Sequence, residues 1–170
     1  TVFNIASIDP GAFDDKPMRP YNVGPNGVIL NNANGTMTNT QLGGIIVGNP
    51  NLKGGAANVI LNEVNGGSPS QLRGYTEVAG QSAKVIVANP YGVTCSGCGF
   101  INTNHATLTT GTATYDNKGN VSGLDVSKGQ VTITGKGMDT RSTQYTDIIA
   151  RSVKVNAKLQ ANELNIVTGN

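Results

Sequence analysis

Charged and aromatic side chains are scarce in this chain. Only 13% of its residues are Asp, Glu, Lys or Arg, against about 25% in an average globular protein, and there is no Trp. The net charge is only +2, and neither a Lys/Arg cluster nor an aromatic stacking platform is present. These absences argue against nucleic acid as a partner. They also leave no aromatic surface for binding sugar rings.

Long apolar runs are missing as well. No stretch approaches the roughly 20 apolar residues that a membrane-spanning helix needs. The chain starts at Thr1 with strand-like residues and shows no signal peptide. A signal peptide is removed on maturation, so its absence leaves the location of the protein open.

Metal-ligating residues are equally few. His105 is the single histidine, and the two cysteines lie together in Cys95-Ser96-Gly97-Cys98. A zinc site commonly needs a second Cys or His pair, so we expect no metal and no cofactor. A redox-active pair would open a helix, and no helical pattern follows. We therefore expect a local disulfide between Cys95 and Cys98, with two buried thiols as the alternative.

Glycine, asparagine and threonine are abundant instead, and 23 residues are Gly. Asn and Gly favour turns, whereas Thr and Val favour strands, so this composition predicts many short strands joined by tight turns. Strands are expected at Val28–Leu30, Ile45–Val47, Val59–Leu61, Val85–Val87, Thr107–Thr109, Val131–Ile133 and Ile148–Leu159. Turn signals separate them, such as Asn34-Gly35 and Asn117 to Asn120.

The spacing of these strands predicts a solenoid. Val85 to Leu108 and Leu108 to Val131 are each 23 residues (108 − 85 and 131 − 108), and Val131 to Val153 is 22 (153 − 131). Val153 to Ala161 alternates apolar and polar residues, which predicts a strand with one buried face. A β-sandwich would show hairpin turns every 8–12 residues or so.

These patterns favour an all-β fold, a right-handed parallel β-helix with small extra β elements, over a sandwich. Asn31, Asn32 and Asn34 are expected to stack their amides on neighbouring coils. Residues 1–21 contain three prolines and lack the coil pattern, so we expect them to cap one end of a single domain whose coils fill 22–170. The other end has no obvious stop, and we expect the parent chain to continue C-terminally.

Ordered motifs run along the first two-thirds of the chain. They are Asn22–Asn32, Asn49-Pro50-Asn51-Leu52, Ile60–Val64, Ser68–Leu72, Gly74–Gly80, Asn89-Pro90-Tyr91-Gly92-Val93 and Gly99–Thr103. In this order they resemble the two-partner secretion, or haemagglutination-activity, domain at the N-terminus of filamentous-haemagglutinin-type exoproteins. One motif departs from the family pattern, because Tyr91 and Val93 stand where many members have Asn and Ile. The Cys-x-x-Cys resembles the branch of haemolysins and contact-dependent growth inhibition toxins.

The resemblance implies a function in secretion. Such domains cross the inner membrane of Gram-negative bacteria and bind the periplasmic POTRA domains of a cognate outer-membrane TpsB-type β-barrel transporter. They then emerge on the cell surface or are secreted, and there they nucleate folding of the β-helix that follows. The resemblance therefore implies a monomeric recognition module without enzymatic activity.

The two Asn-Pro motifs have two interpretations. Asn before Pro favours extended or turn geometry, so Asn49 to Leu52 and Asn89 to Val93 are expected at coil corners, with Asn side chains capping the turns. The functional interpretation is direct contact with the transporter. We favour the structural role.

Two other classes of function stay open. One is an adhesin domain that binds host carbohydrate or protein directly. The other is a β-helix carbohydrate-active enzyme, which we rank last because acidic clusters with paired basic groups are not evident. Asp14-Asp15 is expected in a solvated turn rather than in a catalytic or calcium site, and His105 is expected to be a solvated turn residue.

Overall fold

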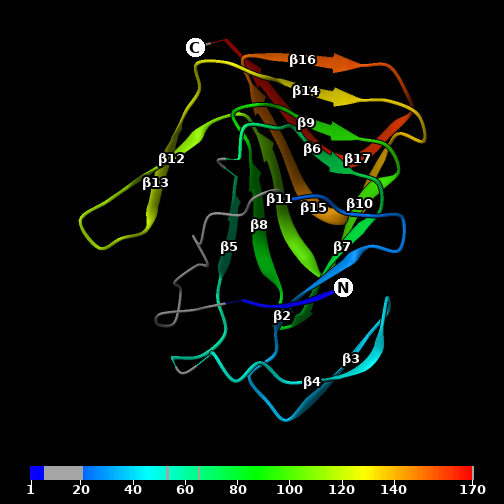
Figure 1. Ribbon diagram of the computed structural model, residues 1–170, viewed down its shortest axis with the longest axis vertical. Helices are drawn as coiled ribbons and strands as arrows, with labels where there is room; N and C mark the ends of the chain where they lie inside the picture. Colours follow the sequence, from blue (N-terminus) through cyan, green and yellow to red (C-terminus); the bar gives the residue numbers. More distant parts are fainter. Residues whose placement is uncertain (6–20, 53, 65, 170) are drawn as a thin grey trace.

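The computed structural model describes residues 1–5, 21–52, 54–64 and 66–169. These residues contain 17 strands and no helix, and most strands pair in parallel. The chain winds into a right-handed parallel β-helix whose successive coils stack along the long axis of the molecule (Figure 1). The expected fold class is confirmed.

Each full coil contributes strands to three faces. The first face contains β1 (Val2–Asn4), β2 (Val28–Asn32), β7 (Tyr75–Gly80) and β10 (Cys98–Ile101). The second contains β5 (Val59–Glu63), β8 (Ala83–Ala88) and β11 (Thr103–Thr109). The third contains β6 (Ser70–Leu72), β9 (Val93–Cys95), β14 (Gln130–Ile133) and β16 (Ser152–Val155).

Two long strands join the first and second faces. β15 (Met138–Ala150) pairs with β10 through Met138 and Asp139 and with β11 from Tyr145 onward, and β17 (Leu159–Thr168) follows β15 along the same path. A bulge interrupts the pairing between Thr140 and Tyr145, where the strand turns from one face to the next. Inside this bend the Thr146 hydroxyl donates to the Thr140 hydroxyl at 2.9 Å, which satisfies two buried polar groups.

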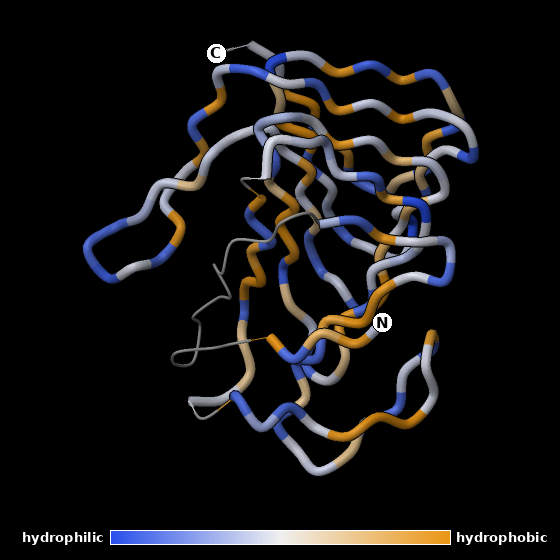
Figure 2. Tube along the Cα trace, viewed as in Figure 1, coloured by the Kyte–Doolittle hydropathy of each residue, from blue (hydrophilic) through white to orange (hydrophobic). Residues whose placement is uncertain are grey.

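The core fills the interior of the coils. Side chains in register stack on one another along the axis, as Val87, Leu108 and Ile148 do, and all three are fully buried. Each such burial stabilises the fold by about 1.5–3 kcal/mol relative to exposure. Figure 2 shows the resulting alternation of apolar and polar residues along the strands. Alternate residues of the strands thus face the interior and form the core, as the sequence pattern predicted.

Two antiparallel hairpins leave the coil path. β3 (Met37–Thr40) pairs with β4 (Gly44–Val47), and β12 (Thr112–Tyr115) pairs with β13 (Val121–Asp125). The first hairpin extends at the bottom of the molecule and the second at its left side (Figure 1). Small extra β elements were expected in general, but the sequence did not locate either of these hairpins.

The regular spacing of 22–23 residues is only partly correct. Val131 and Val153 are partners in register, but Leu108 pairs with Val87 and with Ile148, 40 residues later (148 − 108). Leu108 and Val131 lie on different faces. The β12–β13 hairpin lengthens one coil, and the sequence pattern did not reveal that insertion.

The predicted C-terminal strands also need correction. The expected strands at Ile148–Leu159 and Val153–Ala161 are divided among β15, β16 and β17, with corners at Arg151 and at 156–158. Alternation continues through these corners, so periodicity alone did not mark them. Of the expected cap at 1–21, Val2–Asn4 form β1, which adds to β2 in parallel, and 6–20 lie outside the described residues. The expected carboxylate pair at Asp14-Asp15 falls in that range.

Candidate functional site

The first Asn-Pro motif follows the β3–β4 hairpin. The Asn49 carbonyl oxygen Oδ1 accepts the backbone N–H of Asn51 at 2.8 Å, which closes a tight turn. Its Nδ2 group donates to the carbonyls of Ile5 and Asn31, at 2.6 and 2.8 Å. One buried amide therefore fixes the turn and ties it to β2 and to Ile5, the residue that follows β1.

The second motif turns the chain from β8 to β9. Asn89 Oδ1 accepts the backbone N–H of Tyr91 at 2.9 Å, and the Asn89 carbonyl accepts that of Gly92 at 3.0 Å. Its Nδ2 donates to the carbonyl of Ser68 and to the Ser70 hydroxyl, at 2.8 and 3.0 Å. Gly92 has a φ of 126°, which residues with a side chain rarely adopt. The arrangement repeats that of the first motif.

Exposure divides each motif in two. Asn49, Leu52, Asn89, Gly92 and Val93 are buried. Pro50, Asn51 and Tyr91 are exposed, and Pro90 is half-buried. The Tyr91 ring lies under the Lys128 ammonium, 4.2 Å from its centroid. The geometry supports the structural interpretation for both asparagines, and contact with a partner stays a prediction for the exposed residues.

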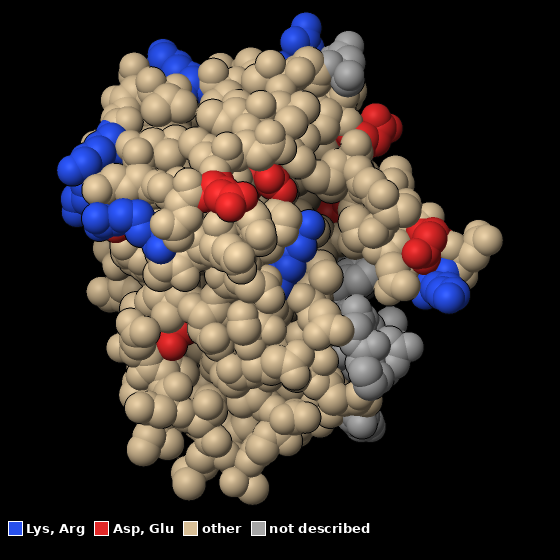
Figure 3. Space-filling view, turned by 180° about the vertical axis from the view of Figure 1, so that it is seen from behind, with Lys and Arg blue, Asp and Glu red and all other residues tan. Residues whose placement is uncertain are grey.

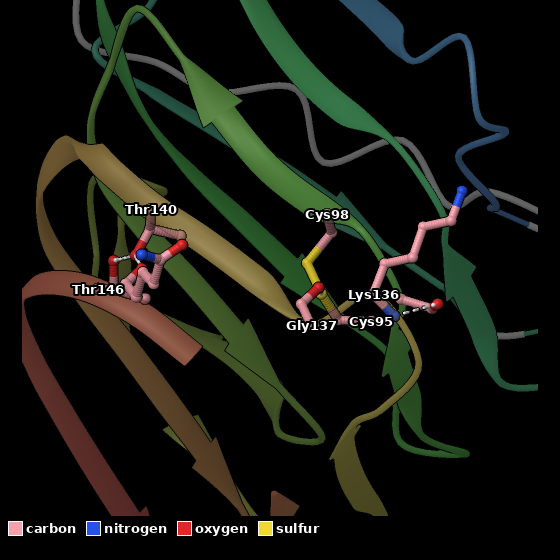
Figure 4. The surroundings of a disulfide bond; sticks show 8 residues. Cys95, Cys98, Lys136, Gly137, Thr140 and Thr146 are labelled. Atoms are coloured by element: carbon pink, nitrogen blue, oxygen red, sulfur yellow. Dashed lines mark hydrogen bonds between the residues drawn. A yellow bond between two sulfur atoms is a disulfide. The ribbon is translucent and has the colours of Figure 1, made fainter. Parts of the chain in front are cut away.

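The two cysteines lie at the corner between β9 and β10. Their sulfurs are joined in a disulfide, and both residues are buried in the core (Figure 4). The neighbouring corner packs against them, where the Lys136 N–H donates to the Ser96 hydroxyl at 3.2 Å. The pair therefore closes one turn and contributes apolar surface to the interior.

His105 is not the solvated turn residue that we expected. It lies in β11, and its Nε2 atom is 2.6 Å from Asp147 Oδ2 on the neighbouring strand. The Tyr145 ring stands beside it, with the ring centroids 5.8 Å apart. Sequence reasoning could not reveal this contact, because His105 and Asp147 are 42 residues apart along the chain.

The asparagine ladder is partly confirmed. Asn31 donates from Nδ2 to Asn4 Oδ1 at 2.9 Å, an amide contact between paired strands. Asn32 instead bonds to backbone groups, donating to the carbonyls of Ala57 and Gln81. Asn34 is exposed. The buried amides therefore bind corner backbone more than they bind each other.

The β3–β4 hairpin is a surface feature that sequence reasoning missed. Glu77 of β7 fastens its tip, since its carboxylate oxygens accept the N–H groups of Gln41 and Leu42 at 2.9 and 2.8 Å. The opposite side of the hairpin is apolar, with Met37, Ile45 and Val47 exposed by 67%, 71% and 74%. The available sequence signal was the Gly43-Gly44 turn signal directly before the strand expected at Ile45–Val47.

Charge is unevenly distributed over the surface. Residues 20–52 contain no Asp, Glu, Lys or Arg, and the lower part of the molecule is almost uncharged in Figure 3. Lys and Arg gather higher on one flank (Figure 3). Arg141 lowers the pKa of Asp139 through their hydrogen bonds, with the nearest atoms at 2.8 Å. Residues 20–52 therefore contribute no charged side chain to the binding of a partner.

The described residues offer no group of three or more His, Cys, Asp or Glu side chains able to hold a metal ion. Among the same residues, no helix has the length and apolar character needed to cross a membrane.

Comparisons with known proteins agree with this geometry. The chain is 55% identical over 166 residues to a protein named toxin CdiA from Yersinia pestis and 53% identical over 169 residues to a tRNA nuclease CdiA from Escherichia coli strain NC101. These matches cover 98% and 99% of the chain but only 5% of each relative. The chain thus spans about one-twentieth of the length of these curated relatives.

A solved structure, the filamentous hemagglutinin secretion domain, superposes on this chain with a TM-score of 0.90 at 36% identity. The match covers 99% of the chain and 57% of that structure. The family model of the TPS secretion domain matches residues 18–170. The chain has a buried asparagine turn at each motif and winds into a three-faced parallel coil. Together with these matches, this geometry shows that the chain belongs to the TPS secretion domain family.

Proposed function

We propose that this domain is the element by which a long exoprotein is recognised for export, through binding to the periplasmic POTRA domains of its TpsB-type outer-membrane transporter. The observation that carries the proposal is the family match over residues 18–170, together with the structural likeness to a secretion domain. The bound partner is a protein, and the route leads through the periplasm to the surface of a Gram-negative cell or into the medium.

We assign binding rather than catalysis to the domain. The toxin and nuclease names belong to relatives of which this chain covers 5%. The rest of each relative has ample length for those activities. The exoprotein's own activity therefore lies outside the proposal.

The exposed members of the two motifs are the proposed contacts. Asn49 and Asn89 use their side chains to build the turns, so they shape the surface and do not reach a partner. Pro50, Asn51 and Tyr91 stand outward on those turns. Rigid, pre-ordered turn residues lose little conformational freedom on binding, which favours affinity.

Templating of the following coils is the second part of the proposal. Leu164 and Ile166 belong to the inward-facing row of β17, in register with Thr146 and Ile148, yet they are exposed by 37% and 43%. A further coil would cover them and pair with the strand edge beside them. The greater length of the relatives supports such a continuation.

Binding of the purified domain to the periplasmic domains of the cognate transporter tests the recognition role. We expect the wild type to bind and Asn51→Ala to weaken binding about fivefold or more, as for truncation of a contact residue. Asn104→Ala is the matched control, since Asn104 is also exposed and lies outside the motifs. Failure of the wild type to bind at both low and physiological salt would overturn the proposal.

Direct adhesion is the second candidate, and one observation favours it. The exposed apolar side of the β3–β4 hairpin has the character of a protein-binding surface. Binding of the isolated domain to host cells, lost in an Ile45→Ser/Val47→Ser double variant with unchanged transporter binding, would support this function. Absence of binding to cells would exclude it.

A further inference from the structure

The β12–β13 hairpin covers part of the outer face of the large sheet. Leu61, Ile86 and Ala88 of β5 and β8 point away from the interior of the coils and pack with Ala113 of β12 in a small second core. Glu63 fastens the hairpin, accepting hydrogen bonds from the Ala113 N–H at 3.3 Å and the Tyr115 hydroxyl at 3.5 Å. The hairpin is thereby held over β5 and β8.

A groove of about 340 Å³ opens beside this hairpin. Its floor includes Ile86, Thr107, Asp147 and Ile149, from three neighbouring strands, and Lys84 lies at its margin. Its wall is the consecutive stretch Val121–Leu124 of β13. Successive residues of a strand point to opposite faces, so four consecutive lining residues mean that the groove runs along the edge of β13.

That edge is free in the part of the chain that the structure describes. There β13 pairs with β12 on one side, and none of the described strands pairs with it on the other. A free strand edge presents unpaired backbone N–H and C=O groups, which can accept another strand. Five residues of β13 would present an edge of about 17 Å.

Thr107 supplies an independent observation. It is only 2% exposed, and its hydroxyl has no hydrogen-bond partner. Its neighbours Ala106 and Leu108 point into the core, so Thr107 points outward, into the groove that it lines. A buried hydroxyl without a partner destabilises the free domain and is poised to bond with a group that enters the groove.

We propose that this groove binds an extended polypeptide segment, which adds a strand to the free edge of β13 and forms a hydrogen bond with the Thr107 hydroxyl. The proposal rests on the proposed function, and the segment belongs to the periplasmic domains of the transporter. Backbone pairing along β13 favours a peptide over a small molecule. Alternate residues of the segment face Ile86 and Ile149, so we expect them to be apolar.

Thr107→Val tests the hydrogen bond. Valine keeps the shape of threonine and removes the hydroxyl, so the free domain should melt at the same temperature or higher. Affinity for the purified periplasmic domains should fall about fivefold. Thr143→Val is the control, because Thr143 is 1% exposed, also has an unpartnered hydroxyl, and does not line the groove. It should leave the affinity unchanged.

Filling the groove tests its shape. Ile149→Trp should abolish binding to the periplasmic domains while circular dichroism and the melting curve show a folded domain. Val167→Trp is the matched control, since Val167 is the register partner of Ile149 on β17 and lies outside the groove. Equal loss of binding in the two tryptophan variants would contradict a site confined to the groove.

Hydrogen exchange of the wild-type complex is the deciding measurement. Added strand pairing should slow exchange of amides within Val121–Leu124 by about tenfold or more, because a newly hydrogen-bonded amide must open before it exchanges. Binding without this protection, and without loss of affinity in Thr107→Val, would overturn the groove while leaving the recognition role intact. No binding by the wild type would overturn both.

Discussion

At the scale of single residues, asparagine satisfies much of the backbone at the coil corners. Asn49 donates to two backbone carbonyls. Asn102 donates to the carbonyls of Val78 and Gly80, and Asn162 donates to those of Arg141 and Thr143. A neutral amide offers two donors and one acceptor without the cost of burying a charge. This explains why asparagine, rather than a charged residue, occupies these corners.

Replacing the buried motif asparagine should destabilise the fold. Asn89→Ala removes two donated hydrogen bonds and one accepted one, and it takes this partner away from the buried Ser70 hydroxyl. We expect a loss of about 2–4 kcal/mol in the free energy of unfolding, measured by urea denaturation. Asn51→Ala, at an exposed position, should change it by less than about 0.5 kcal/mol. Similar losses for both would contradict a turn-building role for Asn89.

Reduction of the disulfide should have a moderate effect. The bond links residues only three apart, so it constrains the unfolded chain modestly, by about 2 kcal/mol. The reduced thiols remain small apolar groups in the same core. Denaturation with and without a thiol reductant should therefore show a lower midpoint and an unchanged native circular dichroism spectrum. Loss of the native spectrum on reduction would mean that the disulfide is required for folding.

At the scale of elements, the β3–β4 hairpin depends on one carboxylate. Glu77 is 4% exposed and accepts two backbone N–H groups at the hairpin tip. Hydrogen bonds to a charged acceptor contribute about 1.5–3 kcal/mol each. Elsewhere on the hairpin the Asn31 Nδ2 group donates to the Val47 carbonyl at 3.0 Å, whereas the Met37, Ile45 and Val47 side chains are exposed.

Glu77→Ala should therefore release this hairpin. We expect amide exchange of Gln41 and Leu42 to become faster by at least about tenfold, because local opening no longer breaks two charge-assisted bonds. The coils around Leu108 should keep their protection. Glu77→Gln retains one acceptor oxygen and should have an intermediate effect. Unchanged exchange in Glu77→Ala would show that other contacts hold the hairpin.

At the scale of the whole molecule, neighbouring coils pack backbone against backbone, and this close packing contributes to stability. Gly137 has a φ of 79°, and a Cβ atom there would overlap the carbonyl oxygen of Lys158 on the next coil. The Met138 N–H donates to that same oxygen at 3.0 Å. A glycine is required here both for the backbone conformation and for the spacing of two coils.

Gly137→Ala should lower the free energy of unfolding by more than the strain of a positive φ alone would. We expect a loss of about 2–5 kcal/mol, from left-handed strain plus overlap with the neighbouring coil. Gly67→Ala is the control, because Gly67 has a similar φ of 86° and open space around it. It should cost about 1–2 kcal/mol in the same denaturation experiment. Equal costs would show that the coils can move apart.

Local chemistry determined the strands, the turns at the Asn-Pro motifs, and the family. Alternation of apolar and polar residues is a local property, so strands such as Val131–Ile133 were predictable from sequence alone. The turns at Asn49 and Asn89 were predictable for the same reason, since a side chain and a backbone group two residues apart form them.

Only the tertiary structure decided which strands pair and what the surface presents. Leu108 meets Ile148 rather than a residue on the β14 strand, because the β12–β13 hairpin interrupts the coil path and antiparallel hairpins carry the same alternation as coil strands. His105 with Asp147, and Thr107 within the groove, come from contacts across strands far apart in the chain. Such contacts depend on register, which one sequence read along its length does not contain.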